Sequence, residues 1–418
     1  MIPVIIAGIA NKQLNFDYTM DELGALASAN DMVVCADIRQ NISRPLAASY
    51  FGKGKCEEIA TSAQLHDCSI LVVNDELSAV QIRNLEELTG LQILDRTALI
   101  LEIFAKRART KEAKLQVEIA KLQYQLPRLR TSSINKFDQQ TAGNTGGGYT
   151  NRGAGEKKIE LNRRVLEKRI SNLKKELKEL LKGQETRRKA RKQAGLKTVA
   201  LVGYTNAGKS TTLNGLLKLV GQDADKQVFE KDMLFATLDT SVRRLHFADN
   251  QTFLLSDTVG FVSKLPHHLV AAFKSTLAEA AQADLLVHVV DLSDPHMKEM
   301  MDTTDQTLKE IGVNNIETLY AFNKADKTNE NYPQCEGNDL IYCANDPSSL
   351  ELLAQTIKQR LFKDLVTQTF LIPFDQGRFV ELLNQQATII STEYTTTGTQ
   401  ISAQLSLQLA GRLRQFKI

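Results

Sequence analysis

GYTNAGKS, residues 203–210, matches the phosphate-loop pattern G-x-x-x-x-G-K-S. It follows the strand-like run KTVALV and precedes the helix-like run STTLNGLLKL, which is the context that such a loop requires. Its glycines let backbone N–H groups surround a β-phosphate, Lys209 brings positive charge to the β- and γ-phosphates, and Ser210 can ligate Mg²⁺. The stretch therefore predicts a nucleotide-binding α/β fold, and a plain glycine turn is the weaker alternative.

Two further motifs end later strand-like runs. DTVG, residues 257–260, ends FLLSD, so Asp257 can hold a Mg²⁺-bound water and the Gly260 N–H can meet the γ-phosphate. NKAD, residues 323–326, ends TLYAF, and the Asp326 carboxylate can accept from guanine N1–H and N2–H₂, groups that adenine lacks. Three such motifs in order on successive strand ends predict a GTP site.

Two softer segments complete the predicted site. In FATLD, residues 235–239, we expect Thr237 to close on Mg²⁺ and the γ-phosphate, with Thr240 as the rival, and the backbone of 343–345 to contact guanine O6. The predicted catalytic residues are Lys209, Thr237 and Gly260, and the predicted Mg²⁺ ligands are Ser210, Thr237 and, through water, Asp257. The predicted nucleotide-binding residues are Gly203, Tyr204, Thr205, Asn206, Ala207, Gly208, Lys209, Ser210, Thr211, Phe235, Ala236, Thr237, Leu238, Asp239, Asp257, Thr258, Val259, Gly260, Asn323, Lys324, Ala325, Asp326, Cys343, Ala344 and Asn345.

Phe261 stands where the best-known GTP switches carry a glutamine that orients the attacking water. No amide is present at this position, so we expect slow turnover in isolation and a partner that completes the site. A base supplied by His267 or His268, or an arginine finger from Arg243 or Arg244, is the weaker alternative.

The rhythm of apolar runs divides the chain into four predicted domains. Residues 1–98 alternate short strands with helices, as an α/β domain does. Residues 99–194 carry two helical stripes joined by a glycine-rich tip at 131–155, which predicts an antiparallel hairpin. Residues 195–363 read as a doubly wound, mostly parallel GTPase domain, and 364–418 as a small α+β domain.

Charge is concentrated in the predicted hairpin. Residues 105–192 hold 25 Lys and Arg against 9 Asp and Glu, a local charge of +16, whereas the rest of the chain holds 27 against 40. A basic stretch of this kind favours a polyanionic partner, because each neutralised phosphate releases a counterion. A solvated helix surface is the alternative.

Composition excludes several classes of protein. Apolar residues make up 42% and charged residues 24%, which fits neither a disordered nor a collagen-like chain. The five cysteines form no C-x-x-C pair, which is typical of a reducing cytoplasm without structural zinc. The apolar runs are too short to cross a bilayer. We expect a cytoplasmic monomer with no DNA partner and no membrane insertion.

The chain resembles the HflX GTPases. The resemblance includes GYTNAGKS, LFATLD and DTVGF in the predicted GTPase domain, GKGKCEEI in the N-terminal domain, and DRTALILEIFAKRARTKEAKLQVEIAKLQYQLPRL and RGAGEKKIELNRR in the hairpin. The departures are local: the tip reads GGGYTNRGAGE, Leu161-Asn162 precede the paired arginines, and no proline follows Asp239.

The resemblance implies a GTPase that binds the large ribosomal subunit and its rRNA, and that splits or rescues stalled ribosomes under stress. It implies GTP or GDP as ligand, Mg²⁺ as cofactor, and K⁺ at Asn206, a position from which related GTPases ligate a monovalent cation. Tyr149, Arg152, Arg163 and Arg164 are the expected RNA contacts. Two alternatives stay open: a GTP-dependent adaptor that needs no turnover, and an RNA-remodelling NTPase that also uses ATP through the GKGK loop at 52–55.

Overall fold

The computed structural model describes the chain except residues 11–14, 130–149, 194–195, 222–233, 236–240, 250, 265–277 and 314. Its contacts divide the chain into two compact units. The first unit contains residues 1–186, 231–239 and 260–276. The second contains residues 187–230, 240–259 and 277–418.

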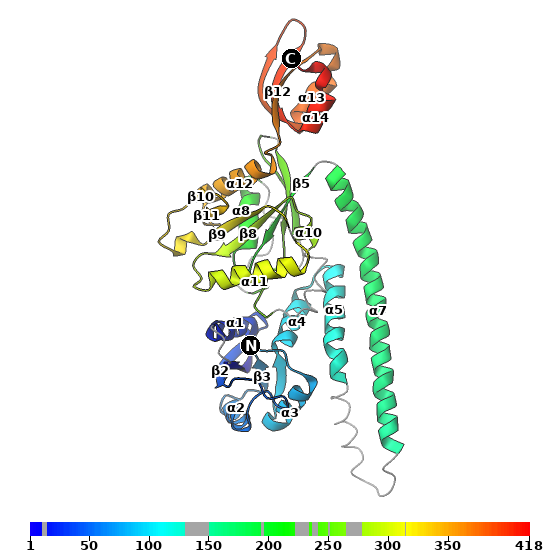
Figure 1. Ribbon diagram of the computed structural model, residues 1–418, viewed down its shortest axis with the longest axis vertical. Helices are drawn as coiled ribbons and strands as arrows, with labels where there is room; N and C mark the ends of the chain where they lie inside the picture. The colour runs from blue at the N-terminus through cyan, green and yellow to red at the C-terminus, as the bar shows by residue number, and fades with distance from the viewer. Residues whose placement is uncertain are drawn as a thin grey trace. The chain divides into compact units, whose positions relative to one another are not determined.

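The first unit is built on a four-stranded parallel sheet of order β2-β1-β3-β4. Helices α1 and α4 pack together on one face, and α2 and α3 pack together on the other (Figure 1). Apolar strands such as ILVV are buried on both faces, as parallel strands are. The elements are β1 (Ile2–Ala10), α1 (Phe16–Ala29), β2 (Met32–Asn41), α2 (Lys53–Leu65), β3 (Ile70–Val73), α3 (Ala79–Thr89), β4 (Gln92–Asp95) and α4 (Arg96–Arg107).

A helical hairpin follows the sheet. It consists of α5 (Lys111–Gln125), the short 3₁₀ helix η1 (Leu126–Arg128) and the 44-residue helix α7 (Thr150–Gln193). Lys111 pairs with Glu176, and Arg169 pairs with Glu118, so the two helices run antiparallel. The predicted basic antiparallel hairpin is confirmed.

The second unit is built on a seven-stranded sheet of order β10-β11-β9-β8-β5-β7-β6. Its central strands are parallel, whereas β6 and β10 pair antiparallel to their neighbours. Helices α8 and α12 lie on one face and α11 on the other (Figure 1). The elements are β5 (Lys197–Val202), α8 (Lys209–Leu219), β6 (Ser241–His246), β7 (Thr252–Asp257), α10 (Ala278–Ala281), β8 (Leu285–Asp291), α11 (Met297–Glu310), β9 (Thr318–Asn323), η3 (Ala325–Lys327), β10 (Gln334–Glu336), β11 (Asp339–Ile341) and α12 (Pro347–Leu361).

The C-terminal part of the second unit has a three-stranded antiparallel sheet of order β12-β14-β13. Alternate residues of β14 are buried against the helices, so this sheet has one covered face. The predicted order of strand, helix, strand, strand and helix is confirmed. The elements are β12 (Val366–Ile372), η4 (Phe374–Gln376), α13 (Gly377–Gln386), β13 (Thr388–Tyr394), β14 (Thr399–Leu405), α14 (Leu407–Arg412) and η5 (Arg414–Phe416).

Two details differ from the sequence pattern. The first helical stripe is interrupted at Ala108, whose backbone is extended, and the Thr110 side chain accepts from the Ala113 N–H to begin α5. Residues 150–155, expected in the glycine-rich tip, belong to α7. No helix among the described residues is long and apolar enough to cross a membrane.

Candidate nucleotide-binding site

The phosphate-loop stretch connects β5 to α8, and two of its glycines are required by close contacts. Gly203 has φ +145°, and a Cβ there would lie 2.2 Å from the Val289 carbonyl oxygen. Gly208 has φ +96°, and its Cβ would lie 2.1 Å from Asn323 Nδ2. Both positions exclude a side chain, so the backbone can form a tight turn at the carboxyl end of β5.

Lys209 begins α8 and is 6% exposed. Its Nζ donates to the carbonyl oxygens of Gly203 at 3.0 Å and Tyr204 at 2.7 Å. Burial lowers its pKa to about 8, and the Asp257 carboxylate opposes that shift. The ammonium is thus held within the loop whose backbone is expected to surround the phosphates.

A hydroxyl and a carboxylate meet beside the loop. Ser210 Oγ donates to Asp257 Oδ2 at 2.7 Å, and Asp257 is fully buried at the end of β7. The neighbouring Thr258 hydroxyl donates to the Leu201 carbonyl at 2.7 Å, which fixes the backbone after β7 against β5. Because Mg²⁺ prefers hard oxygen ligands, this pair fits the metal that a GTPase uses.

Asn323 joins the two loops that are expected to hold phosphate and base. Its Nδ2 donates to the Ala207 carbonyl at 2.9 Å, and its Oδ1 accepts from the Ala344 N–H at 2.9 Å. Since Asn323 is buried, both bonds are shielded from water. The phosphate loop and the loop after β11 therefore have a common anchor at the end of β9.

The residues predicted to read the base lie together at the same edge. Asp326 is exposed, and the Cys343 thiol faces its carboxylate; burial chiefly, and this carboxylate in addition, raise the pKa of the thiol. Lys324 Nζ pairs with Asp291 at 2.6 Å. A pocket of about 300 Å³ lies alongside, lined by Thr211, Gly215, Lys218, Leu219, Ala344, Asn345, Pro347 and Leu350.

Some of the predicted residues belong to the first unit, and others lie outside the part of the chain that the structure describes. Phe235 is 2% exposed and packs edge to face on Phe104 of α4, and Gly260 and the buried Phe261 belong to the same unit. The predicted residues outside the described part are Ala236, Thr237, Leu238, Asp239 and Tyr149, together with the alternatives Thr240, His267 and His268 and the side chain of Arg152.

Comparisons with known proteins decide the family. Residues 17–105 match a model described as GTP-binding GTPase N-terminal, 107–191 one described as GTP-binding GTPase Middle Region, and 198–324 one described as 50S ribosome-binding GTPase. A GTPase HflX from Caldanaerobacter subterraneus subsp. tengcongensis is 40% identical over 400 residues, covering 96% of this chain and 90% of that protein. The chain belongs to the HflX GTPase family.

A second HflX relative agrees with this assignment. The GTPase HflX of Escherichia coli is 37% identical over 365 residues, covering 86% of this chain and 83% of that protein. A crystal structure titled SsGBP and GDP complex aligns at 25% identity and a TM-score of 0.48, covering 87% of this chain and 99% of that one. As an HflX GTPase, the chain binds guanine nucleotide and hydrolyses GTP, which confirms the predicted family, fold class and activity.

Sequence reasoning missed two supporting contacts of this HflX site. Asp291, which pairs with Lys324, ends the strand-like run LLVHVVD, and that position was the available signal. The Tyr342 hydroxyl lies 2.6 Å from Thr212 Oγ1, which also donates to the Gly208 carbonyl. No motif indicates this second contact, because it joins residues 130 positions apart.

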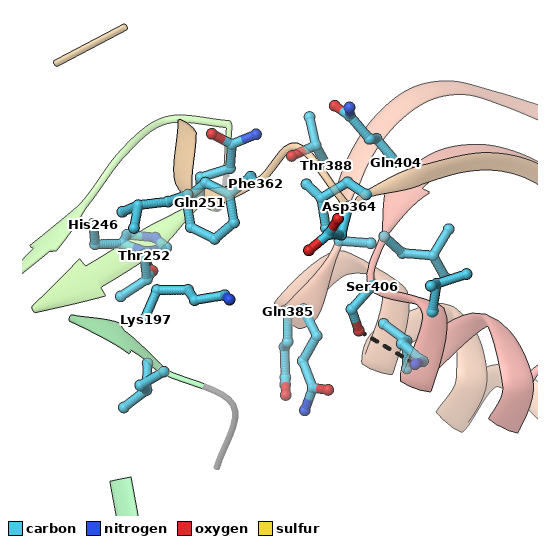
Figure 2. A pocket seen from close by; sticks show the side chains of 18 of the residues that line it. Lys197, His246, Gln251, Thr252, Phe362, Asp364, Gln385, Thr388, Gln404 and Ser406 are labelled. Carbon is cyan, nitrogen blue, oxygen red and sulfur yellow. Dashed lines mark hydrogen bonds between the residues drawn. The ribbon is translucent and has the colours of Figure 1, made fainter. Parts of the chain in front are cut away.

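A second, larger cavity lies at the other end of the strands. It measures about 1090 Å³ and is lined by Lys197 at the start of β5, Thr252 at the start of β7, and residues of the C-terminal sheet and helices (Figure 2). Nucleotide sites in parallel sheets lie at the carboxyl ends of the strands, so this cavity is separate from the candidate nucleotide site. Arg244, one of the alternative arginine fingers, lines it.

Proposed function

We propose that this HflX GTPase binds the large ribosomal subunit through its basic hairpin and, in a GTP-dependent cycle, splits or rescues stalled ribosomes under stress. The proposal places the protein in the cytoplasm as a monomer. Its main support is the exposed basic surface of α7, together with the family description 50S ribosome-binding GTPase for residues 198–324.

Two exposed arginines of α7 can exchange their partners. Arg163 pairs with Glu167 at 2.9 Å and Arg164 with Glu160 at 3.1 Å, one turn apart on the same helix. Their side chains are 48% and 73% exposed, and such solvent-exposed ion pairs contribute little to stability. A phosphate backbone can therefore replace the glutamates at little cost, and Tyr149 and Arg152 near the tip would add contacts to unpaired bases.

Within the GTPase cycle, Lys209 would neutralise the β- and γ-phosphates, and the Gly260 N–H would contact the γ-phosphate. Ser210 and Thr237 would hold Mg²⁺, and Asp257 would orient a water bound to it. The metal, when bound, neutralises charge that develops on the phosphates. The hydrogen bond between Ser210 and Asp257 supports this assignment because it already brings the two oxygen ligands together.

We further propose that the same site selects guanine and binds a monovalent cation. The Asp326 carboxylate would accept from guanine N1–H and N2–H₂, and the backbone of 343–345 would contact O6. Asn206, in the left-handed conformation at φ +63°, would ligate K⁺ beside the phosphates. Equal GTP turnover in Na⁺ and K⁺ would contradict the cation assignment.

The nature of Phe261 supports a slow rate of GTP hydrolysis by the isolated protein. Its side chain is 2% exposed and carries no group that could orient water. We therefore expect the isolated protein to hydrolyse GTP slowly and the ribosome to stimulate it. A fast rate without any partner, lost in Phe261→Ala, would contradict this proposal.

Sucrose-gradient sedimentation of intact ribosomes tests the ribosomal function. With a non-hydrolysable GTP analogue the protein should sediment with the large subunit, and with GTP the gradient should show separated subunits. The Arg163→Glu, Arg164→Glu double variant should lose association, whereas Arg83→Glu, at an arginine paired with Glu87 on α3, should retain it. No association in either nucleotide state would refute the proposal.

A further inference from the structure

The carboxyl edge of the parallel sheet in the first unit binds a segment of the chain itself. Ligands of open α/β sheets bind at this edge. Here Arg96 directly follows β4, Asn74 directly follows β3, and Glu22 comes from α1; all three are at most 5% exposed. Arg96 and Glu22 hold Ser263, which lies three residues after Gly260 in the chain.

Ser263 is held through both its side chain and its backbone. Arg96 Nη2 donates to Ser263 Oγ at 2.9 Å and to the Ser263 carbonyl at 3.2 Å. The Ser263 hydroxyl and N–H donate to the Glu22 carboxylate, which also pairs with Arg96. Asn74 Oδ1 accepts from Arg96 Nη1 at 2.9 Å and fixes the guanidinium. A buried ion pair costs less when its polar groups are hydrogen-bonded, and Ser263 supplies such bonds to both Arg96 and Glu22.

Two more contacts within the first unit hold the Ser263 segment and the segment that contains Phe235. Lys264, which follows Ser263, pairs through its Nζ at 2.6 Å with Asp75, which follows Asn74. At the other end of α4, the Phe104 ring meets Phe235 with centroids 4.6 Å apart and planes at 81°. Helix α4 thus contacts the segment before β6 through Phe104 and the segment after β7 through Arg96.

Asp95, the residue before Arg96, binds Arg128 of the hairpin. Asp95 is fully buried, caps α4 by accepting from the Ala98 N–H at 2.8 Å, and accepts from Arg128 Nη2 at 3.4 Å. Arg128 also donates to the Leu77 carbonyl at 2.6 Å and stacks 3.5 Å from the Tyr124 ring. Its side chain is only 16% exposed, so it anchors the end of α5 and offers little surface to a partner.

We propose that the Asp95-Arg96 junction is the positioning element through which the hairpin controls GTP turnover. Asp95 receives the hairpin through Arg128, and Arg96 holds the segment that continues the Asp257–Gly260 motif. This inference rests on the proposed function, because it assigns to the ribosome-binding hairpin the route by which it acts on hydrolysis. Arg96, Asp95 and Arg128 act through other residues and are not catalytic.

The geometry is suited to this role because the two contacts share one rigid turn. Adjacent residues at the start of a capped helix cannot move independently, so a displacement of Arg128 reaches Arg96 without a flexible linker. A partner that binds more tightly when the hairpin and the Asp95-Arg96 turn take one position favours that position. Ser263, and with it the Gly260 backbone, then moves with the turn.

The test uses the full chain and compares Arg128→Met, Ser263→Ala and the control Arg83→Met. Ser263→Ala keeps the Glu22–Arg96 pair intact, so it guards against a loss of folding, and circular dichroism checks each variant. Arg128→Met and Ser263→Ala should both bind large ribosomal subunits like the wild type, and their basal kcat and KM for GTP should stay within about twofold of the wild-type values. Their stimulation by large subunits should fall about tenfold or more, whereas Arg83→Met should be stimulated normally.

Hydrogen exchange of residues 257–264 supplies a second readout that a merely structural role would not change. Large subunits should alter exchange of this segment in the wild type and in Arg83→Met but not in Arg128→Met. In the free protein, Ser263→Ala should speed exchange of this segment about tenfold, because the bonds of the Ser263 hydroxyl to Arg96 and Glu22 are lost. Folded variants that are stimulated like the wild type would overturn the inference.

The two proposals fail differently. If wild-type protein does not sediment with large subunits, the ribosomal function is wrong. The junction is then judged on the free protein, where Arg128→Met must speed exchange of residues 257–264 relative to Arg83→Met. Equal exchange in these two variants would show that the hairpin anchor and the segment are not coupled, and would overturn the inference by itself.

Discussion

Lys209 shows how burial prepares a residue for an anionic ligand. Its ammonium is satisfied by two backbone carbonyls but is removed from water, which lowers its pKa to about 8 from the ordinary 10.5. Since the unfolded chain binds more protons between these two values, burial of Lys209 costs stability below pH 8, and the free energy of unfolding should rise with pH through this window. A bound phosphate would reverse the shift.

Nucleotide binding should therefore take up protons near pH 8. In the free protein about half of Lys209 is charged at that pH, and a diphosphate that favours the charged form should draw in about half a proton. Calorimetric titration of GDP in buffers of different ionisation enthalpy measures this uptake. Lys209→Arg, which stays charged, should bind without it; the same uptake in that variant would assign the proton to another group.

Asp326 carries the prediction on nucleotide specificity. Asparagine at this position presents an N–H where guanine also presents donors, so Asp326→Asn should weaken GTP and GDP binding about 100-fold or more. Xanthine has a carbonyl at C2 and should bind the variant better than the wild type. Competition between labelled GDP and unlabelled xanthosine diphosphate measures the switch, and unchanged GDP affinity would mean that another residue reads the base.

At the scale of elements, Asn323 is the point where the ends of β5, β9 and β11 are tied together. Asn323→Ala would leave the Ala207 carbonyl and the Ala344 N–H without their buried partner. The free energy of unfolding should fall by about 2–4 kcal/mol, since each unsatisfied group costs about 1–3 kcal/mol. Chemical denaturation with and without GDP measures this loss, and GDP should protect the variant less than the wild type.

The elements also show what a sequence can and cannot predict. The phosphate loop, DTVG and NKAD are local motifs whose glycine, lysine and carboxylate spacings are set by one ligand, so their positions at strand ends followed from the sequence. The break at Ala108 did not, because an apolar alanine continues the helical stripe. The Arg96–Glu22–Ser263 network was also missed, since its members are up to 241 residues apart and belong to no motif.

At the scale of the whole molecule, the dominant feature is the separation of charge along the chain. The hairpin region carries +16 within a chain whose net charge is only +3. Binding to rRNA should therefore depend strongly on salt although the total charge is small, because the local basic surface releases counterions. This dependence separates phosphate contacts from base contacts without a structure of the complex.

The contribution of Arg163 and Arg164 to this salt dependence can be predicted. Replacing both with glutamine should weaken binding to large-subunit rRNA at low salt and should reduce the slope of log K against log salt by about 1.5–2, because each arginine neutralises about one phosphate. Filter binding over a salt series measures the slope. Arg83→Gln, which removes one charge from α3 outside the hairpin, should leave it unchanged. An unchanged slope in the double variant would place the RNA contacts elsewhere and would remove the main support for the hairpin as the ribosome-binding element.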